Sequence, residues 1–237
     1  MPDVFIATPT TRDFSVQYVS SLWQTRIHGA AHWTAISGQA IDIGRNLLIK
    51  SFLKSGMDYL LMHDSDATWH PEAIDRLLSR NLPVVTAIIF KRSLPTVPTI
   101  GKLVGVGVTG AFMYGFADTM NKIVEKCERE HVAADTPNEL LFDACEDDVH
   151  EIDGCGAHFY AIRRDVLEAI GDNWYQETST NGGEDFAFCR KVQQAGFKLY
   201  ADYSVFTGHV VGPGVEIGVR EFMLFRDRVK ADVPWEV

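Results

Sequence analysis

The chain of 237 residues lacks any apolar run of about 18 residues, the length that a membrane-spanning helix requires. No basic residue precedes its first apolar stretch, which is also too short for the core of a signal peptide. We therefore expect a cytoplasmic protein without a transmembrane segment of its own. Its share of apolar residues, 46%, is enough for a sizeable buried core at this length, without help from disulfides.

Cysteine is scarce, and its spacing excludes the common cysteine-based frameworks. The chain has four cysteines with no C-x-x-C pair, so zinc-finger spacing is absent. In a reducing compartment such cysteines remain free thiols. The four residues are Cys127, Cys145, Cys155 and Cys189.

Positive charge is also in short supply. The net charge is −10, and residues 125–151 alone hold ten acids against two bases, so the rest of the chain is close to neutral. A strongly basic surface for duplex DNA is therefore not expected. A local basic groove is left open, and its candidate residues are Lys91, Arg92, Lys102 and the segment 220–230.

What the first part of the chain does contain is a regular alternation of apolar runs and amphipathic segments. Strands are expected at 3–8, 30–36, 58–62 and 83–90, and helices at 14–26, 41–55 and 71–80. Parallel strands need crossover helices between them. The alternation thus predicts an α/β fold with a mostly parallel central sheet flanked by helices.

The remaining two thirds are less regular. We expect loops and hairpins at 91–110, a helix at 115–131, an exposed acidic loop or edge hairpin at 136–151, a strand at 152–163, a helix at 164–171, a loop and helix at 181–196, a strand pair at 197–206 and a helix within 220–230. The length and the absence of repeats favour one domain over residues 1–237.

Two acidic residues, Asp64 and Asp66, directly follow the apolar run at 58–62. In open α/β sheets, ligands bind beyond the carboxyl ends of the strands. A spacing of two puts both carboxylates on one side of an extended segment, about 7 Å apart. Magnesium and manganese take such oxygen ligands and keep positions for phosphate oxygens. The pair predicts a metal site, although an aspartate at a strand end also serves as a helix cap.

Three further polar motifs follow in chain order. They are Asp153-Gly154-Cys155-Gly156, Gly182-Gly183-Glu184-Asp185 and Gly208-His209-Val210. Each has an ordinary structural explanation, respectively a tight turn, a helix N-terminus that favours acids, and a structural histidine. Each also has a functional one: close approach of a ligand, a general base facing an acceptor hydroxyl, and a further metal ligand.

In this order and spacing, the motifs resemble those of the GT-A glycosyltransferases, especially their family-two-like bacterial and phage branch. The resemblance covers roughly residues 3–92 and 152–210, and it is closest over 41–71. It implies a GT-A-like α/β fold with a nucleotide-sugar-binding half at 1–92 and an acceptor and catalytic half with a tail at 152–237. The segment 93–151 has no counterpart and is expected to form a variable insert on the acceptor side.

The resemblance also implies roles for individual residues. Thr8 and Pro9 would cradle the nucleotide, while Arg45, with Asn46 beside it, would lie close to the nucleotide or its diphosphate. Asp64 would touch the ribose or the metal.

The metal ligands implied are Asp64, Asp66 and His209, and the ion would be Mn²⁺ or Mg²⁺. Asp185 would act as the base, with Glu184 near the acceptor or the donor sugar. Asp185 as base favours an inverting displacement, while a retaining one stays open, because retaining GT-A enzymes also combine a D-x-D motif with a histidine ligand.

The sequence departs from the pattern of the family at His63, which precedes the acidic pair at a position where an apolar or acidic residue is commoner. His63 is expected to support a ligand or to act as an extra one.

The donor would be a nucleoside-diphosphate sugar, and the acceptor stays open among a saccharide, a small molecule, a protein and a modified DNA base. A phage source would place the protein in the host cytoplasm. The tail at 220–230 is expected to pack on the core or on a second copy in a homodimer.

Two other functions use similar residues. A nucleotidyltransferase also grips phosphates through a metal, but the loop after the first strand, residues 9–13, lacks the glycines typical of that class. A non-catalytic nucleotide-sugar-binding module is disfavoured by the intact set of Asp64, Asp66, Asp185 and His209.

Overall fold

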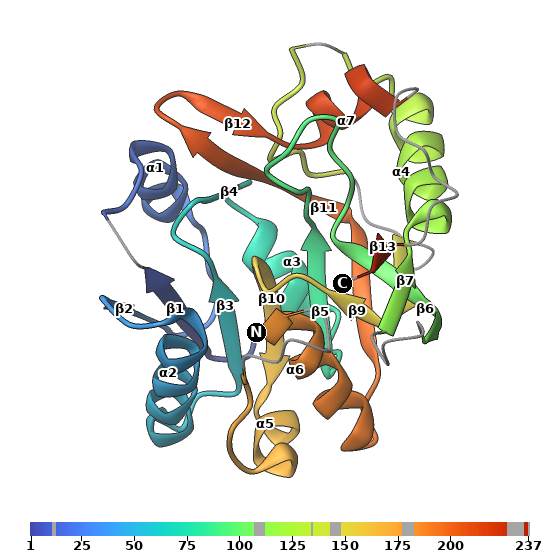
Figure 1. Cartoon of the computed structure of the whole chain (residues 1–237). Helices are drawn as coiled ribbons and strands as arrows, with labels where there is room; N and C mark the ends of the chain where they lie inside the picture. Colours follow the sequence, from blue (N-terminus) through green and yellow to red (C-terminus); the bar gives the residue numbers. More distant parts are fainter. Residues whose placement is uncertain are drawn as a thin grey trace.

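A computed structural model describes most of the chain (Figure 1). The described residues are 1–10, 13–106, 112–133, 135–142, 148–176, 183–226 and 235–236. Cys145, Gly182 and the end of the expected tail helix at 227–230 lie outside them. Within these ranges, no helix is long and apolar enough to cross a membrane.

The first part of the fold follows the expected alternation of strands and helices. Its elements are β1 (Val4–Thr10), α1 (Val16–Gln24), β2 (Ala31–Ser37), α2 (Ile41–Ser55), β3 (Tyr59–His63), β4 (Ala67–Trp69), α3 (Ala73–Ser79) and β5 (Val84–Ile88). The Ser15 side chain caps α1 by accepting a bond from the Tyr18 backbone N–H. Gly56, with φ of 78°, ends α2 in the left-handed conformation that glycine adopts most easily.

The second part adds strands to this sheet and builds a smaller one. Its elements are β6 (Ile100–Val106), β7 (Phe112–Gly115), α4 (Ala117–Arg129), β8 (Val149–Ile152), β9 (Gly154–Cys155), β10 (Phe159–Arg163), α5 (Arg164–Ile170), α6 (Gly183–Gln194), β11 (Leu199–Gly212), β12 (Val215–Ile217), α7 (Val219–Phe225) and β13 (Trp235–Glu236).

The central sheet has the order β12-β11-β5-β10-β3-β1-β2, with β4 and β8 paired to β11. Strands β1, β2 and β3 are parallel to one another, and so are β5 and β11. Strand β10 lies antiparallel between β3 and β5. The fold class predicted from the sequence, a mostly parallel sheet flanked by helices, is confirmed. The second sheet has the order β13-β7-β6-β9.

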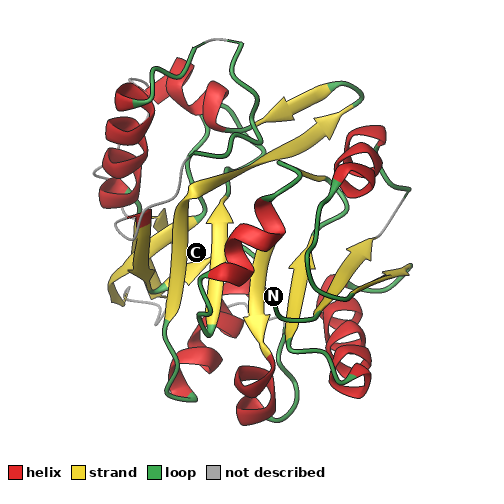
Figure 2. Cartoon of the chain, turned by 180° about the vertical axis from the view of Figure 1, so that it is seen from behind, coloured by secondary structure: helices red, strands yellow, loops and turns green. Residues whose placement is uncertain are grey.

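Helices cover both faces of the central sheet, because its inner strands are apolar on both sides. In β1, Phe5 and Ala7 pack into one hydrophobic cluster, with α2, α5 and α6. Val4 and Ile6 point to the other face and pack into a second cluster, with α1 and α3. Figure 2 shows α3 lying across that second face.

One expectation for the second part was wrong, and another holds only in part. The expected strand pair at 197–206 is one long strand, β11, whose pairing to β5 shifts between Asp202 and Phe206. The acidic segment is only partly a solvated loop, because Leu141 bridges to Val205 and Phe142 is 7% exposed in the core. The strand β8 that follows is paired to β11. Apolar side chains within the acidic run thus anchor it to the sheet.

Candidate active site

A cavity of about 1260 Å³ opens beyond the carboxyl ends of β1 and β3. Its walls come from the end of β1, the start of α1, the loop after β3, the start of α6 and the turn between β11 and β12. Most of the residues singled out in the sequence line it, namely Pro9, Arg45, Asp64, Asp66, Glu184, Asp185 and His209. The volume exceeds that of a site for one small ligand.

The loop after β3 carries Asp64 and Asp66 into the cavity, as the sequence predicted. The backbone N–H of Asp64 donates to the carbonyl of His158, at 3.0 Å, which ties this loop to the start of the antiparallel strand β10. Both aspartate side chains are about one fifth exposed. Their carboxylates are therefore open to a ligand from the cavity but not freely solvated.

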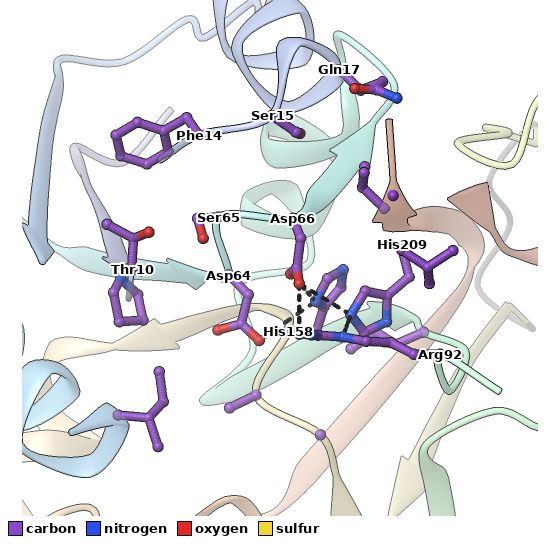
Figure 3. A pocket seen from close by; sticks show the side chains of 18 of the residues that line it. Thr10, Phe14, Ser15, Gln17, Asp64, Ser65, Asp66, Arg92, His158 and His209 are labelled. Atoms are coloured by element: carbon purple, nitrogen blue, oxygen red, sulfur yellow. Dashed lines mark hydrogen bonds and ion pairs between the residues drawn. The ribbon is translucent and has the colours of Figure 1, made fainter. Parts of the chain in front are cut away.

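Two histidines, one directly before β10 and one on β11, meet Asp66. Nε2 of His209, on β11, lies 3.6 Å from Oδ2 of Asp66, and Nδ1 of His158 lies 3.7 Å from Oδ1 of the same carboxylate. The two imidazole rings are 4.2 Å apart between centroids (Figure 3). His158 was not among the residues predicted from the sequence.

The backbone fixes which nitrogen of each ring faces the carboxylates. Nδ1 of His209 donates to the carbonyl of Phe90 at 3.0 Å, and Nε2 of His158 contacts the carbonyl of Gly208 at 3.3 Å. A carbonyl on one ring nitrogen holds the hydrogen there and leaves the lone pair on the other nitrogen, as in histidines that bind metals. Burial, with a contribution from His158, lowers the pKa of His209 and so keeps its ring neutral.

Asp66, His158 and His209 form a group able to hold a metal ion among the described residues. One ligand atom from each lies within 4.8 Å of the others. Oδ1 of Asp66 and Nδ1 of His158 are buried atoms with no hydrogen-bond partner in the part of the chain that the structure describes. Buried polar atoms are normally satisfied, so two orphans facing each other fit a cation between them. Oxygen and imidazole ligands together suit manganese and other first-row divalent ions.

Asp64, which was expected among the ligands, lies beside this group. Its Oδ2 is 3.5 Å from Nδ1 of His158, and its Oδ1 accepts a hydrogen bond from Nη2 of Arg45 at 3.0 Å. Burial raises the pKa of Asp64, but the Arg45 guanidinium outweighs burial and holds that pKa well below its usual range. Asp64 is thus ionised and connects the metal-capable group to Arg45.

Arg45, on the first turns of α2, is a buried cation among three carboxylates. Its Nη1 donates to Glu184 at 2.7 Å and to Asp185 at 2.5 Å, while Nη2 binds Asp64. The guanidinium also lies over the Tyr175 ring, 5.2 Å from its centroid. Burial lowers the pKa of Arg45, but the carboxylates outweigh burial and keep it charged. Arg45 therefore links the loop after β3 to the start of α6.

Asp185 stands at the start of α6 and lines the same cavity as the two histidines. Burial raises the pKa of Asp185 to about 6, and the neighbouring Glu184 adds to the rise, while Arg45 opposes it. A carboxylate whose pKa is raised toward neutrality is a better proton acceptor than an ordinary aspartate. Gly156 lines the cavity near this carboxylate: a Cβ there would lie 3.0 Å from Oγ1 of Thr99 and 3.9 Å from Oδ2 of Asp185, so Thr99 is the residue that leaves little room for a side chain.

Arg92 follows β5 and reaches into the cavity from its rim. Its Nη2 lies 2.5 Å from Oδ2 of Asp66, and its Nε donates to Nε2 of His209 at 2.6 Å (Figure 3). The other basic residues named from the sequence are engaged elsewhere: Lys91 lies over the Phe116 ring, and Arg220 pairs with Glu221. Lys102 lies on β6.

Two residues expected at the nucleotide lie behind the cavity wall. Oγ1 of Thr8 is fully buried and bonded to Tyr18, His63 and the Trp33 indole. The Asn46 amide makes two hydrogen bonds with the backbone of Tyr175, which hold the loop before α6. Both residues support the walls of the cavity.

His63 also lies outside the metal-capable group. It is fully buried, with its ring stacked on Tyr18 and edge-on to Trp69. Side chains alternate along a strand, so His63 faces away from the side that Asp64 faces. Its Nε2 shares a hydrogen bond with Oγ1 of Thr8 at 3.0 Å, so its ring supports the wall of the cavity rather than a residue of the metal-capable group. Burial lowers its pKa to about 3, so its ring is neutral.

The cysteines that the structure describes are free thiols, as the sequence predicted. Cys127, Cys155 and Cys189 are free and buried. Sγ of Cys155 lies 4.0 Å from Sγ of Cys189 behind the start of α6.

Comparison with known proteins places the fold. No protein-family model and no curated protein sequence matches the chain. Among solved structures, A197 from the virus STIV is similar over 93% of this chain and 92% of its own, with a TM-score of 0.60 and 15% identity.

A second similar structure is that of GalNAc-T7 with UDP, GalNAc and Mn²⁺. The similarity has a TM-score of 0.54 and 10% identity, and it covers 88% of this chain. The chain matches 43% of the length of GalNAc-T7. At these identities the likeness concerns the fold, and the chain therefore has the α/β fold of the GT-A glycosyltransferases.

Proposed function

We propose that this protein is a metal-dependent glycosyltransferase that moves a sugar from a nucleoside-diphosphate sugar to an acceptor hydroxyl. The observation that carries the proposal is that one cavity holds both the metal-capable group and the carboxylate of Asp185. The fold supports it, since GalNAc-T7, which shares this fold, is solved with UDP and Mn²⁺. The acceptor, whether a saccharide, a small molecule, a protein or a modified DNA base, is left open.

Asp66, His158 and His209 are the proposed metal ligands, with Asp64 beside them. A divalent cation held there would supply Lewis acidity toward the donor's diphosphate and would offset the charge that builds on the leaving nucleoside diphosphate. Two imidazoles favour Mn²⁺ over Mg²⁺, which prefers an all-oxygen shell.

The nucleotide is proposed to lie between the end of β1 and the start of α1. Pro9 and Thr10 line the cavity there, opposite Phe14. The Phe14 ring is stacked on Tyr18, 4.9 Å between centroids, which holds it in place as a flat apolar wall for a base. Together with the phosphates at Asp66, this orientation directs the sugar toward Gly156 and Asp185.

Asp185 is proposed to accept the proton of the acceptor hydroxyl. The acceptor oxygen forms a bond to the anomeric carbon, the bond from that carbon to the phosphate oxygen breaks, and the nucleoside diphosphate leaves with the electron pair. Arg45 orients Asp185 through its 2.5 Å contact and keeps Glu184 beside it. When the acceptor oxygen attacks in one step while the base removes its proton, the configuration of the anomeric carbon is inverted.

The experiment is to incubate the protein with UDP-, GDP-, CDP- and dTDP-sugars and Mn²⁺, and to measure release of the nucleoside diphosphate, with water in the place of the acceptor. Slow, Mn²⁺-dependent release from one nucleotide class, lost in Asp66→Ala and in Asp185→Asn, is expected. Release of pyrophosphate from a nucleoside triphosphate and a sugar phosphate would point instead to a nucleotidyltransferase. Mn²⁺-dependent nucleotide-sugar binding with no turnover of any donor would leave a binding module.

A further inference from the structure

Arg92 occupies the atoms that a metal would need. Nε2 of His209 has a single lone pair, because Nδ1 is engaged with the carbonyl of Phe90. That lone pair accepts a hydrogen bond from Nε of Arg92 at 2.6 Å. Nη2 of Arg92 forms an ion pair with Oδ2 of Asp66 at 2.5 Å. A metal cannot bind His209 while this hydrogen bond is made. The guanidinium and the metal therefore compete for the same two ligands.

The side chain of Arg92 can move away from Asp66 and His209 at low cost. It is 59% exposed, whereas Asp66 and His209 are 22% and 11% exposed. It reaches the site from just beyond β5, and because most of the side chain is already exposed, its departure gives up little burial. Arg45, the other arginine of the site, is 3% exposed and fixed by three carboxylates. Only one of these two cations can change partners at low cost.

The charges of a bound metal and a diphosphate would determine the new position of the Arg92 side chain. A divalent ion brings two charges to ligands that Arg92 neutralised with one, so the guanidinium is repelled from them. A diphosphate bound to that ion would bring negatively charged oxygens into the same cavity, which Arg92 lines. Guanidinium pairs with phosphate oxygens through two parallel hydrogen bonds, and such charge-assisted bonds are among the stronger ones.

We propose that Arg92 serves as the internal cation of the metal-free site and becomes a ligand of the donor's diphosphate once metal and nucleotide bind. This inference rests on the proposed function, in that it takes the ligand to be a metal-bound nucleoside diphosphate. It makes Arg92 a binding residue with two positions. The exchange keeps the site from holding uncompensated carboxylates when it is empty and links metal entry to donor binding.

The proposal predicts effects of opposite sign in one variant. Without nucleotide, Arg92→Ala should bind Mn²⁺ about three- to tenfold more tightly than the wild type, because a competitor has been removed. At saturating Mn²⁺, the same variant should bind the nucleoside diphosphate about tenfold more weakly, because a charge-assisted contact is lost. Arg92→Lys keeps one charge without the two-point contact and should fall between the two on both measurements.

The experiment measures free Mn²⁺ by electron paramagnetic resonance, and then titrates whichever of UDP, GDP, CDP and dTDP binds the wild type. Arg26→Ala is the matched control, since Arg26 is 70% exposed and contacts one acid, Glu72, outside the cavity. The control should behave as the wild type on both measurements.

The outcomes separate the two claims. Unchanged or weaker Mn²⁺ binding in Arg92→Ala would overturn the role of Arg92 as internal cation. Unchanged nucleotide binding would overturn its role at the diphosphate. If the wild type binds Mn²⁺ but no nucleotide, the proposed function fails, while the Mn²⁺ measurement still decides whether Arg92 competes with the metal.

Discussion

Replacing His158 by alanine should abolish tight metal binding. Nδ1 of His158 lies 3.5 Å from Asp64 and 3.7 Å from Asp66. Neighbouring ligands of an octahedral ion with bonds of about 2.1 Å are about 3.0 Å apart, so an ion draws these atoms inward by only a few tenths of an ångström. Loss of an outer partner of a metal ligand costs about 10- to 100-fold in affinity, and loss of the ligand itself should cost at least about 100-fold, or about 2.7 kcal/mol.

The assay is titration with Mn²⁺, followed by electron paramagnetic resonance, alongside a thermal melt that reports folding. His63→Gln is the control, since His63 is equally buried and close in sequence to the acidic pair but faces away from it. The control should change Mn²⁺ affinity by less than about threefold. A folded His158→Ala protein that binds Mn²⁺ as tightly as the wild type would refute the assignment, as would an equal loss in His63→Gln.

Three further predictions follow from the same geometry. Arg45→Gln should lower the free energy of unfolding by about 3–5 kcal/mol, because three carboxylates lose their buried cation. Urea titration measures this loss, and a loss below about 1 kcal/mol would contradict the prediction. Asp185→Asn should keep Mn²⁺-dependent donor binding yet lower turnover by about 10²- to 10⁴-fold, which parallel binding and rate measurements check. His63 has a pKa lowered to about 3 in the fold against about 6.5 unfolded, so only the unfolded chain takes up its proton between these values. Stability should therefore fall by about 1.4 kcal/mol per pH unit below pH 6.5 on account of this group, and the difference in slope between wild type and His63→Gln measures it.

The sequence was informative where local pattern decides structure. The run at 58–62 followed by two aspartates predicted both β3 and the edge at which Asp64 and Asp66 lie. Pattern also predicted the crossover helices and hence the class of fold. It misjudged β11, because the shift in pairing near Asp202 leaves no mark in the hydrophobic pattern of a strand buried on both faces.

The partners at the site depend on topology, which the pattern does not contain. His158 precedes a strand that runs antiparallel between β3 and β5, and only this insertion brings its ring to Asp66. A histidine two residues after the glycine-rich motif was the available signal. Arg92 was noted only for its charge, since no local pattern indicates how far an arginine reaches. Thr8 and Asn46 were placed at the nucleotide by resemblance, but their side chains are bonded within the wall of the cavity.

The central claim is that the cavity binds a nucleoside-diphosphate sugar through a metal held by Asp66, His158 and His209. The most direct measurement is a thermal melt of the intact protein with UDP-, GDP-, CDP- and dTDP-sugars, each with and without Mn²⁺, repeated on Asp66→Ala. A donor at 100 times its dissociation constant should stabilise the fold by about 2.7 kcal/mol. The account predicts a rise in melting temperature for one nucleotide class, only with Mn²⁺, and none in Asp66→Ala. A melting temperature that no nucleotide sugar raises under either condition would contradict it.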